Sequence, residues 1–228
     1  MKNMLIKVFL LVLIIFSLIN CSKKYEIFYK KGLKYQTKKD IKSLKKAVQN
    51  YDKAITTAVF AFNQKQEALT VLGIKLSELK MYLEAIKYLK KALTIYPGNN
   101  KALYYLGLTY GNYANTFSKY SKKNESYLEA EKYLLRGLAS GGEKIKYYKV
   151  LALLYGIKMN NIKKGIKYIN MSLNIYKNDI SALFIKANLL YRNKQKQAAR
   201  QVYLYILTIT KKGSSDWKNA KRNVEKIY

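Results

Sequence analysis

Apolar residues in this chain recur at intervals of three and four from residue 25 onward, as at Leu69, Leu72 and Leu76. Such spacing places them on one face of an α-helix, whereas a half-buried strand would alternate at every second position. The single proline and the few glycines allow long, uninterrupted helices. The pattern therefore predicts an all-α chain.

A longer period overlies the helical one. Leu72 and Gly73 stand in Leu-x-x-Leu-Gly-x-x-Leu, then Ala85 and Ala92 frame Ala-x-x-x-Leu-x-x-Ala, and Pro97 follows. This order resembles the tetratricopeptide repeat, a 34-residue helix–turn–helix unit. The small residues let paired helices approach closely, and the proline ends the second helix. The resemblance implies a right-handed superhelical solenoid of stacked antiparallel helix pairs.

The pattern returns along the chain, with Gly107 standing 34 residues after Gly73. Small residues in the equivalent place follow at 152 and 187, and a degenerate copy places one at 32. We therefore expect about four to five repeats and a C-terminal capping helix. The repeat-signature residues are Leu72, Gly73, Ala85, Ala92, Pro97, Leu106, Gly107, Tyr110, Ala130, Ala152, Tyr155, Ala187 and Ala199.

These copies predict the organisation of the body. Residues 25–65 form a degenerate N-terminal unit, residues 66–213 the repeat array, and residues 214–228 a capping helix that begins at Ser214 or Ser215. Eleven extra residues, around 114–124, enlarge the second clear unit. We expect its first helix to run longer than its siblings and to project, either as a partner-specific feature or as a tolerated insertion.

The N-terminal segment has the order of a secretory signal. Lys2 and Lys7 precede a short apolar run from residue 8 to residue 19, whose end forms the sequence Leu18-Ile19-Asn20-Cys21. This ending resembles the looser bacterial lipobox of spirochaetes. It implies a signal peptide over 1–20, a lipidated tether over 21–24 with the lipid on Cys21, and a location in the bacterial cell envelope, periplasmic or surface-exposed. The alternative is an uncleaved helical anchor.

The charge balance is strongly basic, with 44 Lys plus Arg against 13 Asp plus Glu and a net charge of +31. Only four of the basic residues are arginine, the side chain best suited to reading base edges, so we expect no nucleic-acid partner. The lysine excess fits the codon bias of an AT-rich genome. It also fits an anionic surface such as lipid headgroups or cell-wall polymer.

A partner-binding groove is expected along the first helix of each repeat. Its candidate residues are mostly aliphatic and aromatic, as protein contacts favour, although the same side chains also serve as packing between helices. The groove candidates are Thr70, Ile74, Tyr104, Tyr105, Leu108, Lys149, Leu153, Phe184, Asn188 and Tyr191.

The residue inventory argues against catalysis. The chain has no histidine and one cysteine, and its carboxylates are scattered, so we expect no catalytic residue, no metal site and no cofactor. The repeat and lipobox resemblances together imply a membrane-anchored adaptor that binds an envelope or membrane protein or a peptide. The alternative is a basic module that binds anionic lipid or cell-wall polymer electrostatically.

Overall fold

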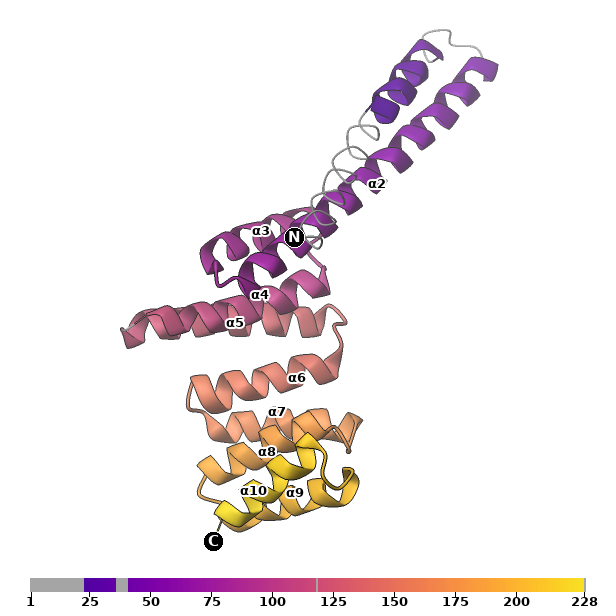
Figure 1. Ribbon diagram of the computed structural model, residues 1–228. Coiled ribbons are helices and arrows are strands. Elements are labelled where there is room, and N and C mark those ends of the chain that lie inside the picture. Colours follow the sequence, from indigo (N-terminus) through magenta and orange to yellow (C-terminus); the bar gives the residue numbers. More distant parts are fainter. Residues whose placement is uncertain (1–22, 36–40, 118, 228) are drawn as a thin grey trace, which may run out of the picture. The chain divides into compact units, whose positions relative to one another are not determined.

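The computed structural model describes residues 23–35, 41–117 and 119–227, and all of its regular structure there is helical (Figure 1). The predicted all-α repeat solenoid is confirmed. The chain divides into two compact units, residues 1–72 with 91–97 and residues 73–90 with 98–228. The predicted signal peptide and the tether cysteine, Cys21, lie outside the described residues. No helix of the described segments is both long and apolar enough to cross a membrane.

The first unit contains an antiparallel hairpin, made of a helix over residues 23–35 and the beginning of α2 (Ile41–Glu78). The ammonium of Lys46 lies 5.5 Å from the ring centroid of Tyr35, and that of Lys53 lies 5.9 Å from the ring centroid of Phe28. Because the later residue of one helix meets the earlier residue of the other, the two helices run in opposite directions.

The helix α2 is continuous for 38 residues. The boundary predicted between residues 65 and 66 therefore coincides with no break in the backbone, and two helices that we expected to be separate are one. The physical reason is local: no glycine or proline stands between Ile41 and Gly73, so no residue around position 65 favours a break in the helical hydrogen bonds.

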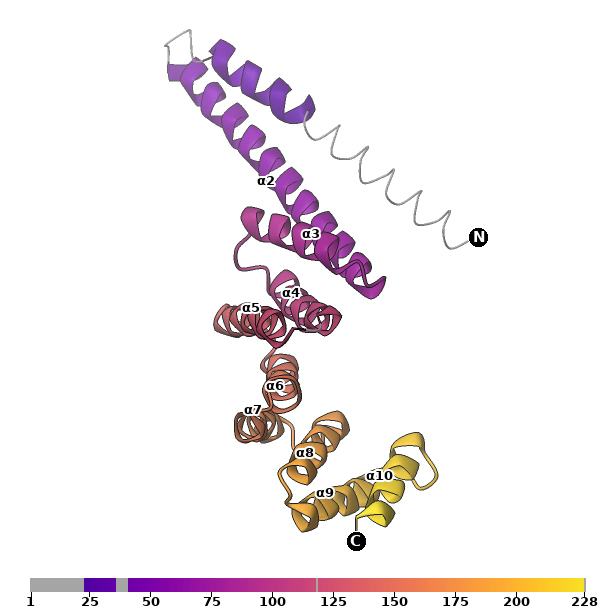
Figure 2. The ribbon, with the colours of Figure 1, turned by 90° about the vertical axis from the view of Figure 1, so that its left-hand side faces the viewer.

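The second unit is a succession of paired helices (Figure 2). After α3 (Tyr82–Ile95), which contributes to both units, α4 (Asn100–Tyr113) packs on α5 (Tyr120–Ala139), α6 (Lys144–Leu153) on α7 (Ile162–Ile175), and α8 (Ile180–Arg192) on α9 (Lys196–Ile209). The last helix, α10 (Ser215–Lys226), packs on α9. Ser214 caps it by accepting a hydrogen bond from the Trp217 N–H at 3.2 Å, one of the two predicted caps.

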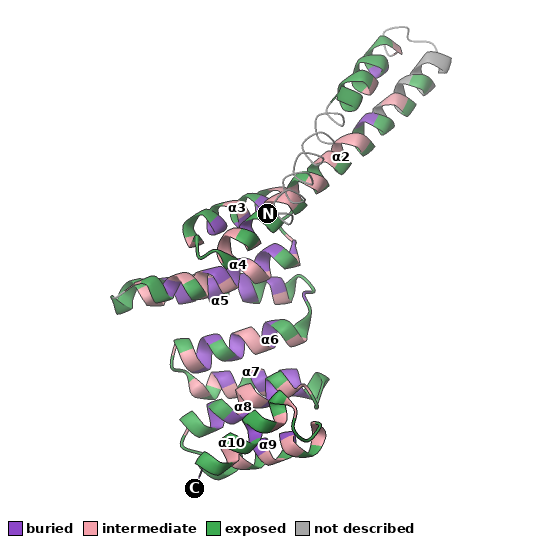
Figure 3. Ribbon diagram, viewed as in Figure 1, coloured by how far each residue is buried: buried purple, intermediate pink, exposed green. Residues whose placement is uncertain are grey.

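Small residues allow the two helices of a pair to pack closely along their shared interface, which we call the seam. A Cβ atom on Gly73 would lie 2.6 Å from Cγ of Leu89, and one on Gly107 would lie 2.5 Å from Cγ of Leu134. Buried faces meet between the paired helices (Figure 3). Among the signature residues, Ala85, Ala92, Leu106, Ala130, Ala152, Tyr155, Ala187 and Ala199 are buried, whereas Leu72 and Pro97 are exposed.

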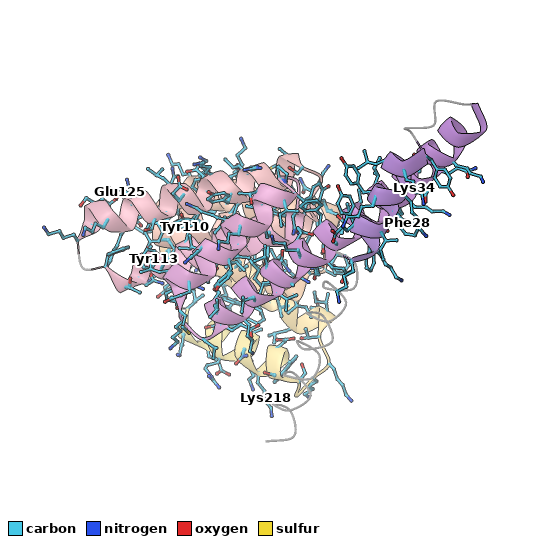
Figure 4. All side chains as sticks on the ribbon, turned by 90° about the horizontal axis from the view of Figure 1, so that it is seen from above. Phe28, Lys34, Tyr110, Tyr113, Glu125 and Lys218 are labelled. Carbon is cyan, nitrogen blue, oxygen red and sulfur yellow. The ribbon has the colours of Figure 1, made fainter. Side chains whose placement is uncertain are left out.

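The eleven-residue insertion lengthens the second helix of its pair, so our prediction about the first helix is wrong. The helix α4 has 14 residues, as do α3, α7 and α9, whereas α5 has 20. A short 3-10 turn over Ala114–Thr116 and an extended Phe117 separate the two. Figure 4 shows Tyr110 and Tyr113 on α4 beside the extension of α5 that carries Glu125. Tyr113 and Phe117 have helical spacing but meet as an edge-to-face pair across the turn, with ring centroids 4.8 Å apart.

A second irregularity is a π-helical turn, Leu154–Lys158, that continues α6. The equivalent small residues of the regular repeats, Gly73 and Ala85, are 12 positions apart, but Ala152 and Gly165 are 13 apart. A π turn accommodates one extra residue inside a helix. The turn therefore absorbs the extra residue, and Gly165 still lies against the backbone of the π turn and of Ala152.

Candidate binding groove

A hollow of about 510 Å³ lies between α4 and α6 in the second unit. Its lining includes three tyrosines and a lysine that can make aromatic and cationic contacts: Tyr104 and Tyr105 from α4, and Tyr147 and Lys149 from α6. Three of these are predicted groove candidates. The hollow is completed by Asn100, Lys101, Glu143, Lys146 and Val150.

The aromatic wall of the hollow is built from edge-to-face contacts. The ring of Tyr104 lies edge-on to both Tyr105 and Tyr147, with centroids 5.4 Å apart in each pair. Burial raises the pKa of Tyr104, and the neighbouring Tyr105 adds to this shift. The Tyr104 hydroxyl therefore stays a neutral donor and acceptor at physiological pH, on a ring with little freedom to turn.

Tyr147 is one of the lining residues that were not predicted from the sequence. Its ring is buried, and its hydroxyl donates a 2.7 Å hydrogen bond to the carbonyl oxygen of Asn100. Burial raises its pKa to about 12. Gly137 and Gly142 make room for the ring, because a Cβ atom at either position would collide with it. These two glycines near a tyrosine were the available signal.

Asn100 lines the hollow, and its side chain is only partly hydrogen-bonded. Its Nδ2 donates to the carbonyl oxygen of Ser140 at 3.1 Å, while its buried Oδ1 has no hydrogen-bond donor among the described residues. A buried acceptor without a donor costs free energy.

The ammonium of Lys149 is already paired with a side chain of the protein. Its ammonium donates to Oδ2 of Asp179 and to Oγ of Ser181, each at 2.8 Å. Burial raises the pKa of Asp179, but hydrogen bonds from Lys149, from the Ala182 N–H and from Ser181 outweigh it and hold this pKa below its ordinary value. Asp179 also caps α8, so the ion pair joins α6 to the start of α8.

A second hollow, of about 710 Å³, opens beside α8 and reaches Asp216 of α10. Of the predicted groove residues it contains Phe184, which is half-buried because its ring packs on Tyr203 with centroids 5.9 Å apart. Its polar lining includes Asn178, Asp179, Ser181 and Asp216. The two hollows share the Lys149–Asp179 pair as their border.

The other groove candidates differ in exposure. Leu153, Asn188 and Tyr191 are exposed, and Leu108 and Ile74 are half-buried. Thr70 is completely buried, and its hydroxyl donates to the carbonyl oxygen of Gln66 at 2.9 Å, so its side chain is not presented to a ligand.

Comparisons with known proteins agree on the architecture. A family model described as "Plant specific mitochondrial import receptor subunit TOM20" matches residues 72–203. No curated protein sequence matches the chain.

Several solved structures resemble it. A thermophilic TPR protein from Thermus thermophilus has 15% identity and a TM-score of 0.63, with 88% of this chain and 99% of that chain covered. PilW, a "widely conserved type IV pilus biogenesis factor", has 17% identity and a TM-score of 0.59, with 86% and 98% covered. YrrB, "a TPR protein with an unusual peptide-binding site", has 18% identity and a TM-score of 0.50, with 69% and 75% covered. At these identities the likeness shows the fold alone.

Proposed function

The chain belongs to the family of the plant-specific mitochondrial import receptor subunit TOM20, and from this premise we propose that it is a non-catalytic scaffold that binds a partner protein or peptide. The family description names an import receptor, and that of YrrB names a peptide-binding site; both support a binding role. Tetratricopeptide-type repeats generally serve as protein-interaction scaffolds.

The hollow between α4 and α6 carries the proposal. Its aromatic rings offer apolar area with little conformational entropy left to lose. The nearby lysines Lys146 and Lys149 are paired with Glu143 and Asp179, so the hollow is not an open cationic surface. A peptide segment held mainly by aromatic contacts fits this chemistry.

The location is part of the proposal. The lipobox-like ending at Cys21 supports a lipid anchor and a place in the bacterial cell envelope, periplasmic or surface-exposed. The partner is then an envelope or membrane protein, or a peptide released there.

The test is affinity capture from solubilised membranes with the double variant Tyr104→Ala and Tyr105→Ala. The matched control is Tyr120→Ala, because Tyr120 is a highly exposed tyrosine outside the hollow. We expect the double variant to lose the wild-type partner by about tenfold or more, as removal of buried aromatic anchors typically does. The control should keep it.

A salt titration of the same capture separates the proposal from electrostatic binding to anionic lipid or cell-wall polymer. Such binding falls steeply as salt rises, whereas aromatic contacts in a hollow depend on salt weakly. Equal capture by the double variant and the wild type would contradict the proposed site. A steep loss with salt in all three proteins would favour the electrostatic module.

A further inference from the structure

We draw no further inference here: the strongest candidate, the hollow beside α8 whose lining joins aromatic side chains to the carboxylates of Asp179 and Asp216, carries nothing because Asp179 is already paired with Lys149, Asp216 belongs to the first turn of α10, and nothing in the structure shows what covers the hollow.

Discussion

Two hairpins of the second unit depart from the regular repeat, and they do so by different means. The pair α4–α5 takes up eleven residues, and the pair α6–α7 takes up one. The longer insertion lies outside the seam and leaves Gly107 against Leu134 as in a regular unit. The single residue has no turn to occupy, so it is absorbed within the helix as a π turn. In this protein the long insertion is excluded from the helical seam, whereas the short one is not.

The largest difference between the two hairpins should appear when their seam glycines are changed to alanine. A Cβ on Gly165 would lie 2.8–2.9 Å from backbone atoms of Gly156 and Ala152, which cannot turn aside. On Gly107 it would meet the side chain of Leu134, which can. We expect Gly165→Ala to lower the free energy of unfolding by about 3–4 kcal/mol and Gly107→Ala by about 1–2 kcal/mol. Urea unfolding measures both, and equal losses would contradict the comparison.

Next in size is the effect of Tyr155→Phe within the π turn. The Tyr155 hydroxyl donates to Glu131 on α5, its ring stacks on Tyr168 at 5.3 Å, and the ammonium of Lys164 lies 3.8 Å from its centroid. Burial and then the bond to Glu131 raise the pKa of Tyr155. Loss of this hydroxyl should cost about 2 kcal/mol in thermal unfolding. The control is Tyr191→Phe, an exposed tyrosine of α8 that should stay near wild type, and equal losses would remove the special role of the π turn.

A smaller effect should depend on pH and report on α6. The pKa of Tyr147 is raised to about 12 in the folded chain. Its contribution is therefore complete below the unfolded pKa of about 10 and is lost as pH rises through 12. Between pH 9 and pH 11.5 we expect the wild type to lose about 1 kcal/mol more than Tyr147→Phe does. Identical pH profiles of the two proteins would exclude this role for the hydroxyl.

The smallest effect is expected in the insertion itself. Tyr120 begins the extension of α5 and is 75% exposed. Tyr120→Ala should change the free energy of unfolding by no more than about 0.5 kcal/mol, because exposed positions outside caps and pairs contribute little. A loss above about 1 kcal/mol would mean that the extension is packed, and the contrast with the π turn would weaken.

The repeat fold was predictable because small and apolar residues recur at fixed intervals along the sequence. Gly73 and Gly107 are 34 residues apart, and each is the position where a side chain would collide with the partner helix. The start of α10 at Ser214 was predictable for a similar local reason, its hydroxyl cap. Periodicity and caps are properties of neighbouring residues, so they can be read along the chain.

The wrong or missing predictions concern where helices end and which side chains meet, because residue spacing does not determine either. Tyr113, Phe117 and Tyr120 keep a helical interval, which favoured a longer α4, yet the chain turns at Ala114. The continuity of α2 was not predicted, because the spacing of the repeats implied a turn near residue 65. No residue there requires a turn. Tyr147 was missed because its position depends on two glycines, at 137 and 142, in the preceding segment.

Asp179 has a consequence for how the array opens. It caps the first turn of α8 and also receives the ammonium of Lys149 from α6. Fraying of that first turn therefore releases a contact in the preceding repeat. Neighbouring repeats often open as separate steps. Here the amides of α6 and of the start of α8 should exchange with solvent deuterium as one cooperative group, which makes the two hollows stable or unstable together.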